Sequence, residues 1–172
     1  MSWVTGGEGL VGWGVAARLD TSGPERFSEA ESWWHHVHQR MDVDDEVRLP
    51  GSGPVAFTSM AFADSPGRSV MVVPEVVVGQ RDGVRWITTV GDADPKRSAP
   101  VRSPGEVQYD EGQLSAEGYR SAIAEAVRRM CRPDGIGKVV LARDLVATTS
   151  RPVDTRFLLH RLARRHPDCW TF

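Results

Sequence analysis

The sequence predicts an α+β fold, built as a largely antiparallel sheet with helices on one side. Apolar runs at 55–62, 69–78 and 84–90 are separated by turn-forming residues, which is typical of antiparallel strands joined by short turns. Segments with apolar residues at helical spacing lie before and after these runs. A chain of 172 residues suits one ordinary domain, so we expect residues 1–172 to share a single core.

The N-terminal part predicts one strand and then a short amphipathic helix. Residues 9–18 are rich in glycine, valine and tryptophan, which favours a strand. Ser28 and Glu31 form a capping box, so a helix is predicted to begin at Ser28. The stripe predicted to face the core contains Ala30, Trp33 or Trp34, Val37 and Met41. The glycines of residues 6–9 superficially resemble a phosphate-binding loop, but a flexible terminus is favoured because no strand precedes them.

The three apolar runs predict three antiparallel strands in a meander. Asp82 and Gly83 form a strong hairpin signal because both residue types tolerate positive φ. Residues 91–113 carry prolines 95, 100 and 104 among charged and small residues. That composition buries little surface, so the segment is predicted to be an exposed loop.

The remainder of the chain predicts a helix, a strand and another helix. The first helix starts near Ser115 and ends near residues 133–135, the strand covers residues 136–148, and the second helix covers residues 153–165 with Asp154 as its N-cap. The apolar residues 169–172 indicate the start of a further strand. We expect its pairing partners to lie beyond residue 172, because no internal repeat supplies them.

Composition argues against several classes of protein. The formal net charge is −2 and the arginines are scattered, which argues against a nucleic-acid-binding face. The most apolar stretch is far shorter than the ~20 residues that cross a bilayer, so no membrane span is predicted. Cys131 and Cys169 form no C-x-x-C pair and no secretory signal is visible, so a cytoplasmic location is predicted.

Lys138 is the main candidate for chemistry, because only Lys96 and Lys138 are lysines among 21 basic residues. It lies in the apolar segment Gly-Lys-Val-Val-Leu-Ala-Arg, residues 137–143. In a strand, Lys138 and Arg143 would point to opposite faces. Burial favours the neutral amine, which is what a lysine general base requires. The alternative is that Lys138 ends the strand and extends its ammonium group into water.

Two other groups of residues invite functional interpretations. Arg143 could bind a substrate carboxylate, but its position favours a structural ion pair with an acidic neighbour. His35 and His38 fall on one helix face and could bind a metal. No further ligand at suitable spacing completes such a site, so surface histidines are the favoured interpretation.

The motif Lys-Val-Val-Leu-Ala-Arg at 138–143, followed by Asp-x-x-x-Leu-Leu-x-x-Leu-x-x-x-x-Pro from Asp154 to Pro167, resembles isochorismate synthases. These belong to the chorismate-utilising family, whose fold is that of anthranilate synthase component I. Residues 53–62 and 72–75 resemble the N-terminal sheet region of that family. The likeness covers most of the chain from about Phe27, and residues 137–170 are its most specific part.

The resemblance implies an isomerase that adds water to C2 of chorismate as the C4 hydroxyl leaves, with Lys138 as the general base. It also implies a glutamic acid as the proton donor and Mg²⁺ bound by glutamates, all expected beyond residue 172. The 172-residue form is therefore expected to be inactive alone, and the full-length enzyme to be a monomer. Menaquinone and siderophore pathways stay open. The alternatives are a salicylate synthase and a non-catalytic remnant or interaction module.

Overall fold

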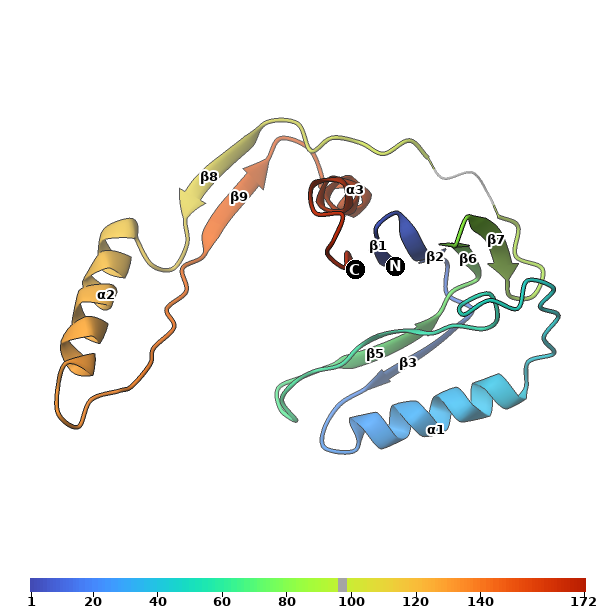
Figure 1. The fold of residues 1–172 in the computed structure, drawn as a ribbon, viewed down its shortest axis with the longest axis horizontal. Helices are drawn as coiled ribbons and strands as arrows, with labels where there is room; N and C mark the ends of the chain where they lie inside the picture. Colours follow the sequence, from blue (N-terminus) through green and yellow to red (C-terminus); the bar gives the residue numbers. More distant parts are fainter. Residues whose placement is uncertain (96–98) are drawn as a thin grey trace. The chain divides into compact units, whose positions relative to one another are not determined.

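The computed structural model describes residues 1–95 and 99–172. Its helices and antiparallel sheets confirm the predicted α+β class (Figure 1). The chain forms two compact units, which are described separately below. The first unit contains Met1–Ala99 and Leu158–Phe172, and the second contains Pro100–Phe157.

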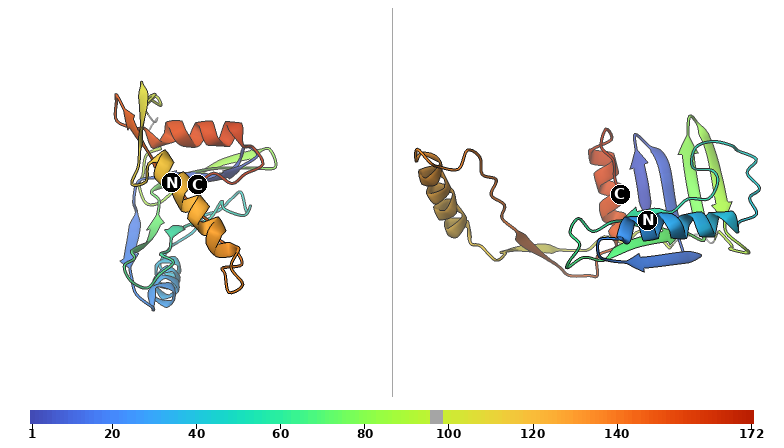
Figure 2. Two further views of the ribbon diagram at one scale, coloured as in Figure 1. Left: turned by 90° about the vertical axis from the view of Figure 1, so that its left-hand side faces the viewer. Right: turned by 90° about the horizontal axis from the view of Figure 1, so that it is seen from below.

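The first unit contains two antiparallel sheets. The four-stranded sheet has the order β1-β2-β6-β7, and the three-stranded sheet has the order β3-β5-β4. Figure 2 shows the β1–β2 and β6–β7 hairpins side by side, joined by pairing between β2 and β6. The strands are β1 (Ser2–Thr5), β2 (Glu8–Trp13), β3 (Ala17–Thr21), β4 (Phe57–Ser59), β5 (Ser69–Val73), β6 (Val76–Arg81) and β7 (Val84–Thr89).

A corner divides two of the predicted strands. The predicted strand at 9–18 is β2 and β3, and the predicted strand at 69–78 is β5 and β6, so the three-strand meander is wrong at this point. Trp13 pairs with Val76, and Ala17 pairs with Val73. Three residues, 14–16, therefore lie opposite two residues, 74–75. Such a bulge bends a ladder. Pro74 lies at the bend because it has no N–H to donate to a continuous ladder.

The hairpin predicted at residues 82–83 is confirmed, with φ of +50° at Asp82 and +77° at Gly83. In this hairpin, Trp86 pairs with Gly79 across the strands. A Cβ atom at residue 79 would lie 2.1 Å from the Trp86 ring, so the indole packs on the bare glycine backbone. Residues 6–9 were predicted to be a flexible terminus, and this is wrong: they form the turn and first residues of the β1–β2 hairpin.

Helix α1 (Arg26–Gln39) contacts β3 (Figures 1 and 2). The predicted helix exists, but the predicted capping box is wrong. Ser28 lies inside the helix, where its hydroxyl donates to the Glu25 carbonyl at 2.9 Å. Ala30 is buried, with 2% of its surface exposed, whereas Trp33 and Trp34 are half-buried.

Arg26 explains why the helix begins before Ser28. Its side chain is 6% exposed and forms an ion pair with Asp64. Its guanidinium also donates to the carbonyls of Gly23, Ala61 and Phe62. A buried charge needs such partners, so this one arginine fixes the first turn of α1 against the loop at 61–64.

The C-terminal residues add to the first sheet. Val4 and Thr171 exchange backbone hydrogen bonds of 3.0 and 2.8 Å, and Thr171 is buried. The expectation that residues 169–172 find their partner beyond residue 172 is therefore wrong for this bridge. The centroid of the Trp3 ring lies 5.2 Å from that of Trp170 and 5.4 Å from that of Phe172. Aromatic packing therefore adds to the backbone pairing between β1 and the C-terminal residues.

The second unit consists of a two-stranded ribbon and a helix. Strand β8 (Val107–Glu111) pairs with β9 (Leu145–Thr149), and helix α2 (Ala116–Met130) lies between them in the sequence. The helix prediction is confirmed, and the Ser115 hydroxyl caps it by accepting from the Gly118 N–H at 3.0 Å.

Two predictions for this region need correction. The loop predicted at 91–113 contains β8, and residues 96–98 of that loop lie outside the described residues. The strand predicted at 136–148 is limited to β9, from Leu145 onward. A strand needs hydrogen bonds to a neighbouring strand, and β8 is paired with residues 145–149 only.

Helix α3 (Thr155–Arg165) confirms the last predicted helix. The Asp154 carboxylate accepts from the Arg156 N–H at 3.1 Å, which fits the predicted N-cap. The guanidinium of Arg156 holds the pKa of Asp154 well below its usual range. Among the helices of the described residues, none combines the length and apolar composition that a membrane crossing needs.

Candidate functional site

Lys138 lies in the second unit, in a segment without regular structure between α2 and β9. The residue is exposed, and no hydrogen bond or ion pair joins it to another described residue. The predicted burial on a strand face is therefore wrong for this chain. Its neighbours Val139 and Val140 are also exposed, at 38% and 80%. The amine is thus accessible to water and to a small molecule.

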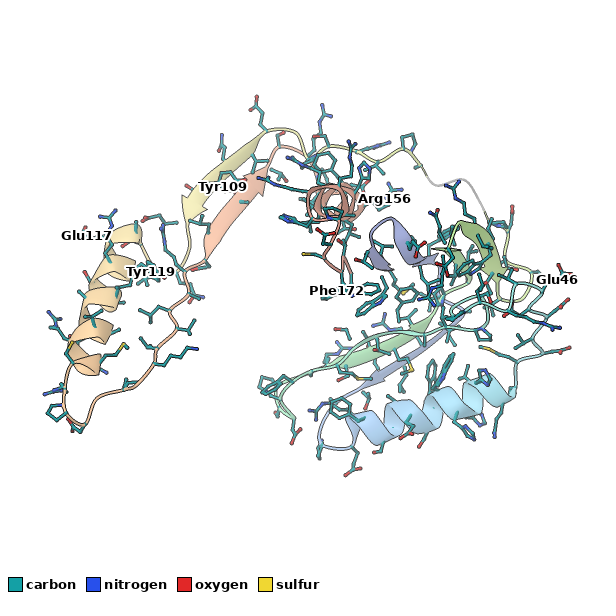
Figure 3. The ribbon with its side chains drawn as sticks, viewed as in Figure 1. Glu46, Tyr109, Glu117, Tyr119, Arg156 and Phe172 are labelled. Carbon is teal, nitrogen blue, oxygen red and sulfur yellow. The ribbon has the colours of Figure 1, made fainter. Side chains whose placement is uncertain are left out.

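The residues that follow Lys138 are fixed at several points. The hydroxyl of Tyr119, on α2, donates to the Leu141 carbonyl at 3.2 Å (Figure 3). The carboxylate of Asp144 accepts from the Gln113 N–H at 3.2 and 3.3 Å. These bonds hold the end of the segment between the helix and the ribbon, at positions three and six residues after Lys138.

Arg143 takes the structural role that the sequence favoured. Its guanidinium forms an ion pair with Glu111 at 3.1 Å and donates to the Leu114 carbonyl at 3.1 Å. The side chain is 23% exposed, so the pair is partly shielded from water. This confirms the predicted ion pair with an acidic neighbour.

The largest cavity described lies in the first unit and has a volume of about 560 Å³. Strands β1, β2, β4 and β5 contribute to its lining. Phe172, which is labelled in Figure 3, also lines it. The lining side chains are mainly apolar and none is charged; the chain-terminal ammonium of Met1 donates to the Gly12 carbonyl at 2.9 Å. The cavity suits an apolar group and offers no charged side chain to bind a dianion such as chorismate.

The predicted histidine pair lies on the exposed surface of α1. His35 makes a hydrogen bond of 2.8 Å with Gln39, and the His38 ring lies 5.6 Å from the Trp34 ring. Across residues 1–95 and 99–172, no group of three or more His, Cys, Asp and Glu side chains is placed to hold a metal ion. We therefore assign no magnesium ligand to this chain.

Antiparallel sheets and an exposed lysine do not by themselves define a class of enzyme. A match to a known protein family does define one. A family model described as chorismate binding enzyme matches residues 3–103, which is more than half of the chain. The protein therefore belongs to the chorismate-binding enzyme family. Neither a curated protein nor a solved structure matches the chain.

The family model matches residues 3–103, whereas the resemblance to isochorismate synthases was most specific at residues 137–170. It covers almost all of residues 1–99 in the first unit and ends before Lys138. The family is thus supported by the sheets of the first unit, including the residues 53–62 and 72–75 that resemble its N-terminal region. The role of Lys138 has no support from this match and stays a prediction.

Two residues with structural roles carry little local signal in the sequence. Arg26 is one of many scattered arginines, and nothing in its neighbours distinguishes it from an exposed one. Trp3 lies at the start of the chain, where its contacts with residues 170 and 172 depend on a sequence separation that no local pattern reveals. The only signal for Trp3 was the concentration of tryptophan and phenylalanine at the two ends.

Proposed function

We propose that the protein is an isochorismate synthase and that Lys138 is its general base. The observation that carries the proposal is family membership, shown by residues 3–103, together with the Lys-Val-Val-Leu-Ala-Arg motif at 138–143. The motif resembles the isochorismate synthases within this family, whose ammonia-using branches resemble one another in having glutamine in place of the lysine. A lysine at this position therefore favours water over ammonia as the nucleophile.

The proposed reaction is an isomerisation that Lys138 would start. Its neutral amine would accept a proton from a water molecule as the water oxygen bonds to C2 of chorismate. The ring double bonds then shift and the C4–O bond breaks. A proton donor converts the departing hydroxide to water, so the atoms balance without an oxidant or reductant. We assign no residue of this chain as that donor.

The exposure of Lys138 sets a condition on this role. A lysine can act as a general base only in its neutral form, which burial favours. The amine must therefore be covered, by substrate or by further protein, when it acts. The 172-residue chain with chorismate and Mg²⁺ is expected to give no steady turnover. Steady isochorismate formation that Lys138→Ala abolishes would contradict this expectation.

The experiment that tests the proposal measures isochorismate formation by the whole gene product. Lys138→Ala and Lys138→Arg are expected to reduce kcat by roughly 10²–10⁴, the usual contribution of a general base. Arginine keeps the positive charge but does not release its proton, so it cannot replace the base. Arg132→Ala is the matched control, an exposed cation six residues earlier, and it should leave kcat unchanged.

Product analysis separates the alternatives. Isochorismate that persists supports the proposal. Release of pyruvate with salicylate would assign a salicylate synthase instead. Calorimetric binding of chorismate without turnover would indicate a non-catalytic member of the family. Full activity of Lys138→Ala would remove Lys138 from the mechanism and leave only the family assignment.

A further inference from the structure

Exposure alternates along the segment that contains Lys138. Val140 and Ala142 are exposed, whereas Leu141 and Arg143 are half-buried. Side chains that alternate in this way belong to an extended backbone, in which residues two apart share a face. Lys138 therefore shares an open face with Val140 and Ala142. The opposite face is turned toward other residues of the second unit.

Backbone pairing does not hold this segment in place. In the part of the chain that the structure describes, no hydrogen bond between backbone groups involves residues 138–143. Strand β8 pairs with residues 145–149 only. Half a turn of an extended backbone would carry Lys138 to the opposite face. The direction in which Lys138 points therefore depends on contacts with side chains.

Two such contacts constrain the segment. The hydroxyl of Tyr119, which is labelled in Figure 3, donates from α2 to the Leu141 carbonyl at 3.2 Å. Two residues later, the Arg143 guanidinium forms its ion pair with Glu111 at 3.1 Å. The first contact orients the peptide group that follows Leu141. The second holds a side chain on the face opposite Lys138.

We propose that Tyr119 and Arg143 are positioning residues for Lys138. Their contacts orient the segment so that the Lys138 amine projects from the open face toward the substrate. This inference rests on the proposed function, in which that amine is the general base. A general base must lie within hydrogen-bond reach of the proton that it accepts. A displacement of about 1 Å can therefore lower the rate by roughly 100-fold.

The test measures isochorismate formation by the whole gene product. Tyr119→Phe removes one oxygen atom and keeps the ring. It should lower kcat by roughly tenfold and leave KM within about twofold, because it disturbs the base and not the binding of substrate. Tyr109→Phe is the matched control. Tyr109 is the only other tyrosine of the chain and is 71% exposed on β8, so this change should leave kcat unchanged.

A double-mutant cycle separates positioning from general support of the fold. If Tyr119 acts through Lys138, Tyr119→Phe should not lower kcat further once Lys138→Ala has removed the amine. A residue that only stabilises the fold should lower kcat by the same factor in both backgrounds. Equal factors would therefore overturn the positioning role of Tyr119.

A second pair of variants tests the contact of Arg143. Arg143→Met keeps a long side chain but removes the charge that pairs with Glu111, so kcat should again fall by roughly tenfold with little change in KM. Arg143→Lys restores the positive charge and should recover part of the lost kcat, although it lacks the two-pronged guanidinium. Circular dichroism of each variant verifies that the helices and sheets remain folded.

The outcomes distinguish this inference from the proposed function. Full activity of Lys138→Ala would remove the general base and the positioning roles with it. Impaired Lys138→Ala beside wild-type kcat in Tyr119→Phe and Arg143→Met would refute the positioning roles alone. A loss of kcat in both variants that disappears in the Lys138→Ala background would support the general base and its positioning together.

Discussion

The two units of this chain are stabilised in different ways. In the first unit, Val73 and Val76 are 1% and 2% exposed, and the sheets and α1 enclose a core. In the second unit, no residue of α2, β8 or β9 is buried. Its order comes from the β8–β9 ladder, the Ser115 cap and side-chain bonds such as Tyr119 to Leu141.

The part of the chain that matches the family model and the residue proposed for catalysis lie in different units. The family model matches residues 3–103, which contain most of the unit with a core. Lys138 belongs to the unit without one. A catalytic amine there depends on groups that cover it, whereas the family fold of the first unit is supported by its own packing.

The largest effect expected from this contrast concerns the core of the first unit. Trp86→Ala removes an indole that is 6% exposed, so it should lower the free energy of unfolding by about 3–5 kcal/mol, the range for large aromatic residues in cores. Urea denaturation followed by circular dichroism measures it. Phe62→Ala is the control, because Phe62 is fully exposed and its loss should change stability by less than about 0.5 kcal/mol. Similar losses in both variants would contradict the assignment of the core.

A smaller effect is expected in the second unit, where local bonds replace packing. Ser115→Ala removes the acceptor for the Gly118 N–H and should destabilise α2 by about 1 kcal/mol. Hydrogen exchange of the α2 amides measures this change. Ser121→Ala changes the same residue type within the helix and should leave exchange unchanged or slow it, since alanine favours helices. Faster exchange in both variants would mean that the cap has no special role.

The smallest expected effect is a dependence of stability on pH in the first unit. The Asp45 carboxylate accepts from the N–H groups of Arg48 and Val47 and from the Ser52 hydroxyl. These bonds, the Arg48 one first, lower the pKa of Asp45 below its ordinary value of 3.8. A lowered folded-state pKa means that the stabilisation is present above about pH 3.8 and is lost as the pH falls below it.

Asp45→Asn tests that dependence, because asparagine keeps an acceptor but does not titrate in this range. The wild type should be the more stable of the two above the ordinary pKa of aspartate, and the difference should shrink as the pH falls through the folded-state pKa. Thermal unfolding at a series of pH values measures it. A difference that stays constant down to the most acidic pH would show that ionised Asp45 does not stabilise this loop.

The sequence predicted the elements that local rules control. Asp82 and Gly83 specified a hairpin, Ser115 specified the start of α2, and the helical spacing after Asp154 specified α3. It failed where a distant partner decides. The run at 69–78 looks continuous, but pairing with β2 and β3 bends it at Pro74. The apolar residues after Lys138 resemble a strand, but β8 pairs only from Leu145 onward.

For the candidate site, the sequence alone determined the family resemblance and the choice of Lys138, because both depend on residue types at fixed spacings. Only the tertiary structure decided that Lys138 is exposed and that Arg143 is held by Glu111. Exposure and ion pairing depend on which residues from distant parts of the chain lie nearby. Local periodicity predicts which face of a helix or strand a residue occupies, but it does not predict which distant residues contact that face.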